Sequence, residues 1–424
     1  MVEPRGRFAA ASPAERPAVA WAFLYFFAIL CGYYMLRPLR DEMGIVGGVK
    51  NLSWQFTATF VVMLLAVPFY SAVVARFPRR TIIPIVYRFC ALSLLAFLVA
   101  DRAHVSEVWV ARVFFVWVSV FNLFVVSIFW SFLVDTFREE QGKRLFGAIA
   151  AGGSLGAIAG PALAALFVKP LGRAGLFVAA ALLLEAAVFC VKRLIAWAEV
   201  NRSAGVWSAP DRPVGGGVFA GFGLALKSPY LLAIAGMLLA YSFTSTVIYA
   251  DQARIVEATI KDSATRIALF ARIDLWVNIV ALSLQGFVTG RVLSVAGLGV
   301  ALCALPLLTA GGFLGLAVVP GLATLVVVQV ARRGLQYGLE RPSREVLFTV
   351  VSSEEKYKAK AFIDTVVFRG GDAASIWAYD AVRSLSPSTA VVTAGMLCVC
   401  AGWVAVAWFA SRRNAALAAA GRGR

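Results

Sequence analysis

Long apolar runs separated by short polar breaks make up most of this chain. A helix that crosses a bilayer needs about 20 mostly apolar residues, and about twelve stretches of the sequence meet that requirement. The pattern therefore predicts an all-α polytopic membrane protein with twelve transmembrane helices. The predicted spans are 17–46, 54–75, 81–101, 106–135, 146–168, 174–198, 228–253, 265–290, 294–318, 320–340, 359–381 and 388–411.

One long polar interruption, residues 199–227, is rich in Gly and Pro and divides the predicted spans into two sets of six. We expect an N-terminal six-helix half at 1–198, a cytoplasmic linker at 199–227 and a C-terminal six-helix half at 228–424.

Similar residues recur in the two halves at an offset of 215 positions. Tyr34 is matched by Tyr249 and Arg76 by Arg291. The third match is a charged cluster, with Glu139, Glu140 and Lys143 in the first half and Glu354, Glu355 and Lys358 in the second. Parallel six-helix repeats are typical of the major facilitator fold, which is therefore the predicted architecture.

Composition excludes most other classes. Of the 424 residues 61% are hydrophobic and only 15% are charged, which does not suit a surface in water. Six cysteines without a C-x-x-C pair, together with a single histidine, His104, exclude a disulfide framework and a zinc cluster. We expect no metal and no other cofactor.

The net charge of +17 would raise the question of nucleic acid in a soluble protein. With the N-terminus inside, however, the inner segments hold about 24 of the basic residues and the outer loops about 9. Because cytoplasmic loops retain Lys and Arg, this asymmetry places both termini in the cytoplasm and makes a nucleic-acid partner unnecessary. The first apolar run exceeds signal-peptide length and lacks an A-x-A cleavage site, so we expect a retained helix.

Several charges fall inside the predicted spans, where an Arg or Asp costs about 2.5–3.5 kcal/mol even on the lenient insertion scale. Arg37, Arg40 and Asp41 share one helical face through their i, i+3, i+4 spacing. Such charges must face one another or water, so they outline a cavity, and Arg suits phosphate or carboxylate groups. The alternative is that ion pairs, such as Arg37 with Asp41 or Arg272 with Asp274, only hold the bundle together. Other intramembrane charges are Asp251, Arg254, Arg332, Arg333, Asp364, Arg369 and Asp372.

The segment 336–364, QYGLERPSREVLFTVVSSEEKYKAKAFID, resembles the region between spans 10 and 11 of the nucleotide (ATP/ADP) translocases of intracellular bacteria and plastids. Span 1 is similar to that family at Arg37, Arg40 and Asp41, and the IFWSFLVDTF segment of span 4 places Asp135 where an acid or amide is usual. The chain departs from the family at Gln336, Arg341 and Val134, and these departures bear on the identity of the substrate.

The resemblance implies a secondary transporter in a bacterial inner membrane that exchanges nucleotides or related phosphorylated anions by alternating access. Arginines would clamp phosphates, aromatic rings would contact the base or sugar, and acids would hold the arginines when the site is empty. The arginines are Arg37, Arg40, Arg332 and Arg333, the rings Tyr34 and Tyr249, and the acids Asp41, Asp274 and Asp364. The remaining candidate substrate-binding residues are Asp135, Asp251, Arg254, Gln336, Tyr337, Lys358 and Lys360. We expect a monomer whose partners are the bilayer and a small anionic solute.

Two other functions stay open. A proton-coupled carrier of another solute would use Asp135, Glu185 or Asp251 as its titrating acid, and a membrane protein without transport activity would use the charges for packing alone. An enzyme is not expected, because the chain has no Walker A loop, no G-x-S-x-G and no H-E-x-x-H motif.

Overall fold

The computed structural model describes residues 11–76, 79–103, 105–202, 228–351, 359–360, 362–386 and 388–422, and in these ranges it is helical without strands. Within them, eight helical stretches are long and apolar enough to cross a membrane. The prediction of an all-α polytopic membrane protein therefore agrees with the fold. Two of the stretches, Glu140–Val200 and Ser263–Val318, contain 61 and 56 residues, far more than the roughly 20 that one span requires.

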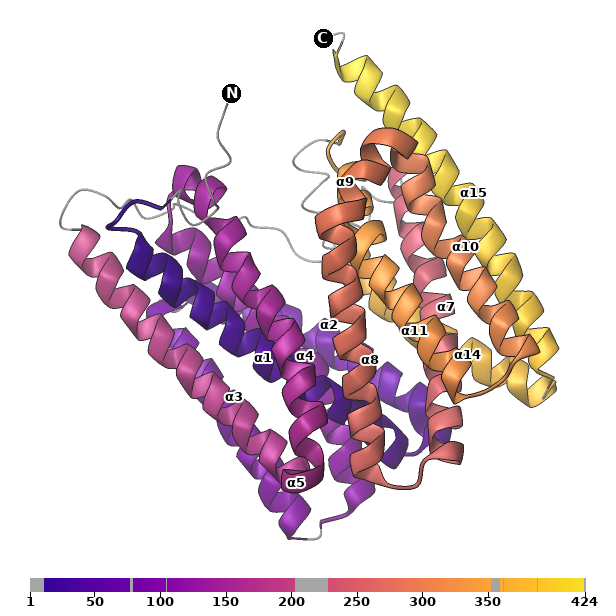
Figure 1. Ribbon diagram of the computed structural model, residues 1–424, viewed down its shortest axis with the longest axis horizontal. Helices are drawn as coiled ribbons and strands as arrows, with labels where there is room; N and C mark the ends of the chain where they lie inside the picture. The colour runs from indigo at the N-terminus through magenta and orange to yellow at the C-terminus, as the bar shows by residue number, and fades with distance from the viewer. Residues whose placement is uncertain are drawn as a thin grey trace. The chain divides into compact units, whose positions relative to one another are not determined.

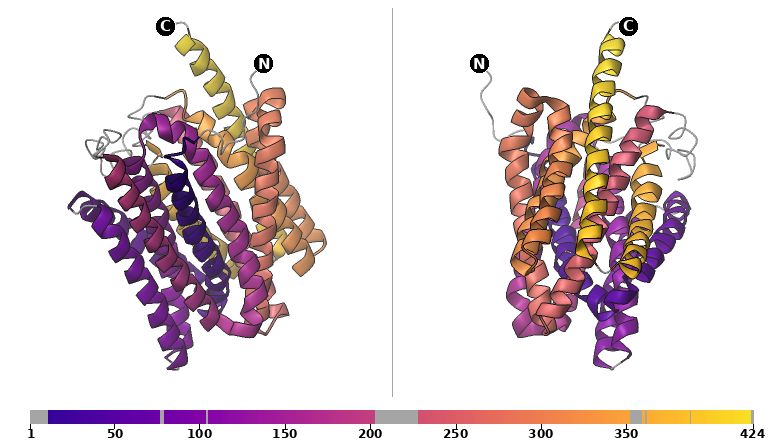
Figure 2. Two further views of the ribbon diagram at one scale, coloured as in Figure 1. Left: turned by 60° about the vertical axis from the view of Figure 1, so that its left-hand side comes forward. Right: turned by 90° about the vertical axis from the view of Figure 1, so that its right-hand side faces the viewer.

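The chain divides into two compact units (Figure 1). The first comprises Met1–Gly47, Phe69–Val214 and Asp262–Leu275, and the second comprises Gly48–Pro68, Gly215–Lys261 and Trp276–Arg424. Each unit therefore includes a short segment of the opposite half of the chain. Within each unit the helices run alongside one another, as the further views in Figure 2 show.

The helices have the following bounds. In the first half they are α1 (Arg16–Val46), α2 (Leu52–Arg76), α3 (Arg79–Arg102), α4 (Glu107–Thr136) and α5 (Glu139–Arg202). In the second half they are α7 (Pro229–Thr259), α8 (Ser263–Ser283), α9 (Thr289–Arg291), α10 (Gly297–Val318), α11 (Leu322–Leu335), α12 (Arg341–Leu347), α14 (Phe368–Leu385) and α15 (Thr389–Arg422). Short 3-10 or π-helical segments are η2 (Val49–Asn51), η4 (Leu284–Val288), η5 (Val292–Ala296), η6 (Gln336–Glu340) and η7 (Ile363–Val367).

Breaks in the long helices fall where the sequence predicts the ends of spans. Gly172 interrupts α5 with φ 63° and ψ −169°, a conformation that glycine adopts without the steric cost of a Cβ atom. Gly297, with φ 82°, follows the π-helical segment η5 and is the first residue of α10. Gly172 lies between the fifth and sixth predicted spans, and Gly297 lies near the start of the ninth.

A stripe of glycines on α5 lets this helix pack directly against the backbone of α1. A Cβ atom at these glycines would lie 2.5 Å or less from a carbonyl oxygen of α1, with Gly152 meeting Phe23, Gly156 meeting Phe27 and Gly160 meeting Cys31. The four-residue spacing on both helices is that of small-residue packing in membranes, where close approach of backbones replaces the hydrophobic driving force.

The same offset of 215 relates this contact to one in the second unit. Gly371 of α14 and Ser242 of α7 stand 215 positions after Gly156 and Phe27. A Cβ atom at Gly371 would lie 3.0 Å from Ser242 Oγ. The α1–α5 contact in the first unit and the α7–α14 contact in the second thus occupy equivalent positions of the two halves.

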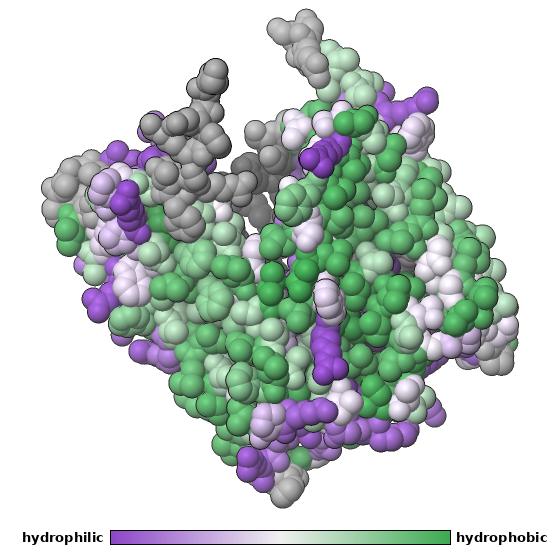
Figure 3. Space-filling model, in the orientation of Figure 1, coloured by the Kyte–Doolittle hydropathy of each residue, from purple (hydrophilic) through white to green (hydrophobic). Residues whose placement is uncertain are grey.

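Large apolar side chains cover the outside of the helices. Leu65, Phe69, Leu166 and Leu182 are 65–69% exposed, and hydrophobic residues spread over much of the face in Figure 3, while hydrophilic residues gather mainly toward the ends of the helices. A contiguous apolar exterior suits contact with lipid tails rather than water.

Glu15 ties the start of α1 to the start of α5 in the first unit. Its carboxylate accepts hydrogen bonds from the backbone N–H of Ser12 at 2.9 Å, from Gln141 Nε2 at 2.8 Å and from Arg144 Nη2 at 3.0 Å. Burial alone would raise the pKa of Glu15, but these hydrogen bonds and the charge of Arg144 outweigh it and hold the pKa below its ordinary value.

Candidate functional site

The arginines that the sequence places on one face of α1 have separate partners. Arg37 Nε lies 3.7 Å from Asp274 Oδ2 of α8, and its guanidinium lies 5.8 Å from the centre of the Tyr34 ring. Arg40 lies 3.6 Å from Asp41 Oδ1, donates to the carbonyl oxygen of Phe115 at 3.4 Å and stacks on the Phe115 ring at 4.1 Å. Asp41 and Asp274 thus lie within ion-pair distance of the two arginines.

A second ion pair joins α1 to α8 and was missed by sequence reasoning. Arg266 Nη1 lies 3.5 Å from Glu42 Oε1, and the Glu42 side chain is fully buried. In α1 Arg37 precedes Glu42, and in α8 Arg266 precedes Asp274. Because the two helices run antiparallel, each arginine lies opposite the acid of the other helix. The only sequence signal was the position of Arg266, about two helical turns before Asp274. Arg272, by contrast, is exposed.

Arg332 is the most deeply buried cation of the candidate site. It is 2% exposed and lies in the second unit. Its Nη2 donates to Ser245 Oγ at 3.2 Å, and its guanidinium lies 5.6 Å from the centre of the Tyr241 ring. Its Nε and Nη1 atoms have no hydrogen-bond partner, and among the described residues no acid lies within ion-pair distance of Arg332.

Another buried donor lies beside the same tyrosine. Trp403 of α15 is 1% exposed, its ring lies 6.1 Å from that of Tyr241, and its Nε1 also has no hydrogen-bond partner in the described part of the chain. Ser245 and Trp403 were not in the sequence-based set, because neither differs from ordinary packing residues until α7, α11 and α15 are brought together.

The π-helical segment η6 begins at Gln336, four residues after Arg332. Arg333 and Gln336 are buried, and Gln336 Oε1 has no hydrogen-bond partner among the described residues. The carbonyl oxygen of Tyr337 accepts from Gln285 Nε2 at 3.0 Å, and that of Gly338 accepts from Thr289 Oγ1 at 2.6 Å. Wide π-helical turns are frequent at functional sites because they leave carbonyl groups free for such bonds.

Asp251 and Arg254 belong to a network that links α7 to α14. The Tyr379 hydroxyl donates to Asp251 and accepts from Arg254 Nη1 at 3.0 Å. Asp251 also lies 3.5 Å from Arg383 Nη2, and Arg254 lies 3.5 Å from Asp380 Oδ1. Two acids and two arginines balance in charge, so this network serves packing better than it serves anion binding. Tyr379, Asp380 and Arg383 are its members that sequence reasoning missed.

A second α7–α14 contact joins the middle of α7 to the first turns of α14. Asp372 Oδ1 accepts from Ser242 Oγ at 2.5 Å and from Thr246 Oγ1 at 3.3 Å, while Oδ2 lies 3.4 Å from Arg369 Nη1. The intramembrane charges Arg369 and Asp372 therefore pair with each other.

The other candidates are dispersed. Asp135 is half-buried near the end of α4, and Tyr249 packs edge-on against Phe56 at 5.5 Å. Lys360 Nζ lies 2.5 Å from Glu345 Oε2, and Asp364 of η7 lies near Arg344 and Lys360. Lys358, with Glu354 and Glu355, lies outside the described residues.

The fold is similar to those of two solved transporters, both of the major facilitator fold. A bacterial homologue of the human lysosomal transporter Spinster, inward-facing and unoccupied, gives a TM-score of 0.53 at 13% identity, covering 96% of this chain and 97% of the other. A bacterial homologue of the iron transporter ferroportin, inward-facing, gives 0.61 at 11% identity, covering 95% and 99%. The sequence matches no protein-family model and no curated protein. At these identities the likeness establishes the fold alone.

Proposed function

We propose that this protein is a secondary transporter of anionic, phosphorylated solutes, with nucleotides as its expected substrates and exchange as its mode. The observation that carries the proposal is Arg332, a buried cation with two unpartnered nitrogen atoms and no acid beside it in the described part of the chain. A cation buried without a counter-charge is costly, and an anion supplied from outside compensates it.

The chemistry of this site favours phosphate or carboxylate over a neutral solute. Among the described residues, Arg332 Nε and Nη1 and Trp403 Nε1 have no partner, and these groups can only donate hydrogen bonds. A planar guanidinium binds such oxyanions through two parallel hydrogen bonds. The rings of Tyr241 and Trp403, 6.1 Å apart, lie beside these donors.

In the first unit the arginines carry their own counter-charges. An incoming anion would exchange places with Asp274 on Arg37 and with Asp41 on Arg40. This arrangement favours exchange. After the first anion is released, the binding site must return across the membrane, and its arginines are better compensated when a second anion occupies it during that step. The proposal includes twelve membrane spans. Of the eight long apolar stretches, α5 and Ser263–Val318 each suit two spans, which makes ten, and the spans predicted at 320–340 and 359–381 complete the twelve. The proposal also includes cytoplasmic termini in a bacterial inner membrane.

Uptake of labelled nucleotides and other phosphorylated solutes into proteoliposomes tests the proposal. Uptake should rise when the vesicles are preloaded with unlabelled substrate and should not respond to a protonophore. Equal uptake into empty vesicles that collapses with the protonophore would instead identify a proton-coupled carrier, and no uptake of any anion would refute the proposal.

Substitution of Arg332 by Met separates function from stability. Methionine fills similar space without a charge, so thermal stability should stay unchanged or rise, as replacement of buried charges by apolar residues often does. Uptake should fall at least about tenfold, equivalent to about 1.4 kcal/mol of lost binding. Arg193→Met is the matched control, because Arg193 is exposed and lies over the Phe189 ring. Retained uptake in the stable Arg332→Met protein would contradict the assignment.

A further inference from the structure

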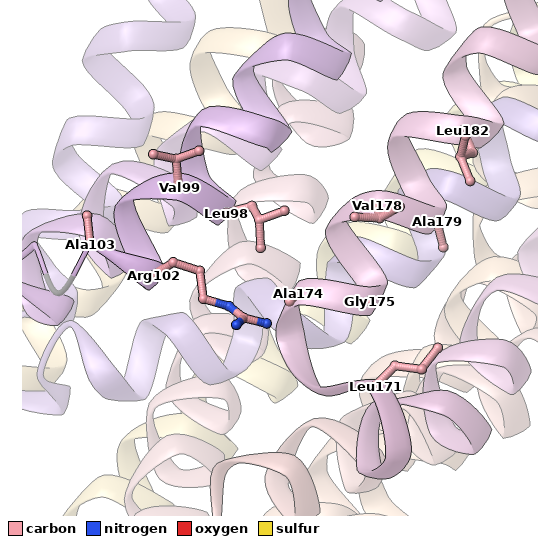
Figure 4. Close-up of a pocket in the computed structure, with 10 residues that line it drawn as sticks. All are labelled: Leu98, Val99, Arg102, Ala103, Leu171, Ala174, Gly175, Val178, Ala179 and Leu182. Atoms are coloured by element: carbon pink, nitrogen blue, oxygen red, sulfur yellow. The ribbon is translucent and has the colours of Figure 1, made fainter.

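A groove runs along the outside of the first unit, between the end of α3 and the kinked part of α5. It contains a cavity of about 910 Å³, within the range of small-ligand sites. Apart from Arg102, the residues that line it are apolar or glycine, and Figure 4 shows Leu98 of α3 and Val178 of α5 pointing into the space between the two helices.

A second cavity continues this groove. Its volume is about 300 Å³, and it shares Val178 and Leu182 with the first. It ends at Arg88 and Glu185, which lie 3.3 Å apart as an ion pair. The groove thus has an apolar middle and a polar group at each end.

Arg102 is the uncompensated charge of the groove. Its guanidinium extends across the groove toward Ala174 in Figure 4. The neighbouring Arg173 is paired, 3.9 Å from Asp101 and 2.8 Å from Glu107, whereas no acid among the described residues lies within ion-pair distance of Arg102. A cation at the end of a transmembrane helix, above an apolar groove, is placed at the depth of lipid phosphates.

The dimensions suit one lipid chain. Beyond the break at Gly172, the residues of α5 that line the two cavities run from Ala174 to Glu185, which is about 16 Å along a helix. Half of the roughly 30 Å hydrocarbon core is about 15 Å. An acyl chain whose headgroup lies at Arg102 would therefore fill this length.

We propose that this groove is a specific phospholipid site, in which one acyl chain lies against Val178 and Leu182 and the phosphate binds Arg102. The site contains none of the candidate substrate-binding residues and does not depend on the proposed substrate.

Native mass spectrometry of the delipidated protein, titrated with phosphatidylglycerol in detergent, tests this proposal. The wild type should retain one tightly bound lipid. Arg102→Gln should weaken its binding at least about tenfold through loss of the phosphate contact. Val178→Trp, which fills the groove from an exposed position, should weaken it similarly. Arg193→Gln, on the same helix as the α5 wall but outside both cavities, should bind as the wild type does.

Two results would overturn the site. One is undiminished binding in folded Arg102→Gln protein, with folding checked by circular dichroism. The other is displacement of the bound lipid by inorganic phosphate at equal concentration, which would reduce the site to an anion contact without a role for the acyl chain.

Discussion

At the scale of single residues, three buried or half-buried arginines are stabilised in different ways. Arg37 has an acid on another helix, and Arg40 has an adjacent acid, a carbonyl oxygen and an aromatic ring. Arg332 has one hydroxyl and one ring. The charge of Arg332 is the least compensated, which is why the proposed function rests on it rather than on the pair in α1.

The Arg37–Asp274 pair gives a prediction about stability. Asp274 is 1% exposed, so removing Arg37 takes an opposite charge away from a buried carboxylate. Either single alanine substitution should lower the free energy of unfolding by about 3 kcal/mol or more. The double substitution should recover much of that loss, because both charges of the pair are then removed.

Thermal unfolding of the four proteins of this double-mutant cycle measures the coupling between the two side chains. Additive losses in the double variant would show that the ion pair does not contribute to the α1–α8 contact.

At the scale of helices, the close contact between α1 and α5 depends on glycine at one face. Gly156→Ala places a methyl group 2.5 Å from the Phe27 carbonyl oxygen and 2.9 Å from the Cys31 nitrogen, both of which belong to the backbone. We expect a loss of about 1–3 kcal/mol, typical of overpacking, seen as a lower unfolding temperature.

The same helix offers a matched control. A Cβ atom at Gly147 would meet nothing within 4 Å, so Gly147→Ala should be neutral or stabilise the helix by up to about 1 kcal/mol. Equal effects of the two substitutions would mean that helix propensity, rather than the α1–α5 contact, determines the result.

The link between Glu15 and the start of α5 predicts a pH dependence. Because the folded-state pKa of Glu15 is below the ordinary value of 4.5, its stabilising contribution is present above that value and is lost as the pH falls through the lowered pKa. Wild-type protein should therefore unfold at a higher temperature than Glu15→Gln near neutral pH, and the difference should disappear in acid. A difference that persists unchanged below the folded pKa would assign the effect to packing of the side chain instead of its charge.

At the scale of the whole molecule, each compact unit includes a segment from the other half of the chain. Gly48–Pro68 belongs to the second unit, where Trp54 packs against Trp377 at 5.1 Å and Thr57 accepts a hydrogen bond from Trp377 Nε1 at 3.0 Å. Asp262–Leu275 belongs to the first unit and carries Arg266 and Asp274, with their ion pairs to α1.

This exchange of segments predicts that neither half is stable alone. Residues 1–214 and 215–424, expressed separately, should each be degraded or aggregate, because each lacks partners for its exchanged segment. Co-expressed halves should co-purify and regain thermal stability. Independent stability of both halves would show that the exchanged segments contribute little to folding.

The sequence by itself determined that this protein lies in a membrane and that its secondary structure is helical. Runs of about 20 apolar residues predict membrane-crossing helices because unsatisfied backbone groups are not tolerated in lipid. Intramembrane charges such as Arg37, Asp274 and Arg332 could also be found, since their cost makes them conspicuous. The recurrence of similar residues 215 positions apart predicted an internal repeat.

The tertiary structure decided which of these charges have partners. Arg266 pairs with Glu42 across 224 positions of sequence, and Arg254 pairs with Asp380 across 126. Two nitrogen atoms of Arg332, by contrast, have no partner in the part of the chain that the structure describes. Sequence spacing relates residues within one helix, but the distance between side chains on different helices depends on how those helices pack. In the first unit the glycine face of α5 sets that packing, because it determines how closely the backbones of α1 and α5 approach.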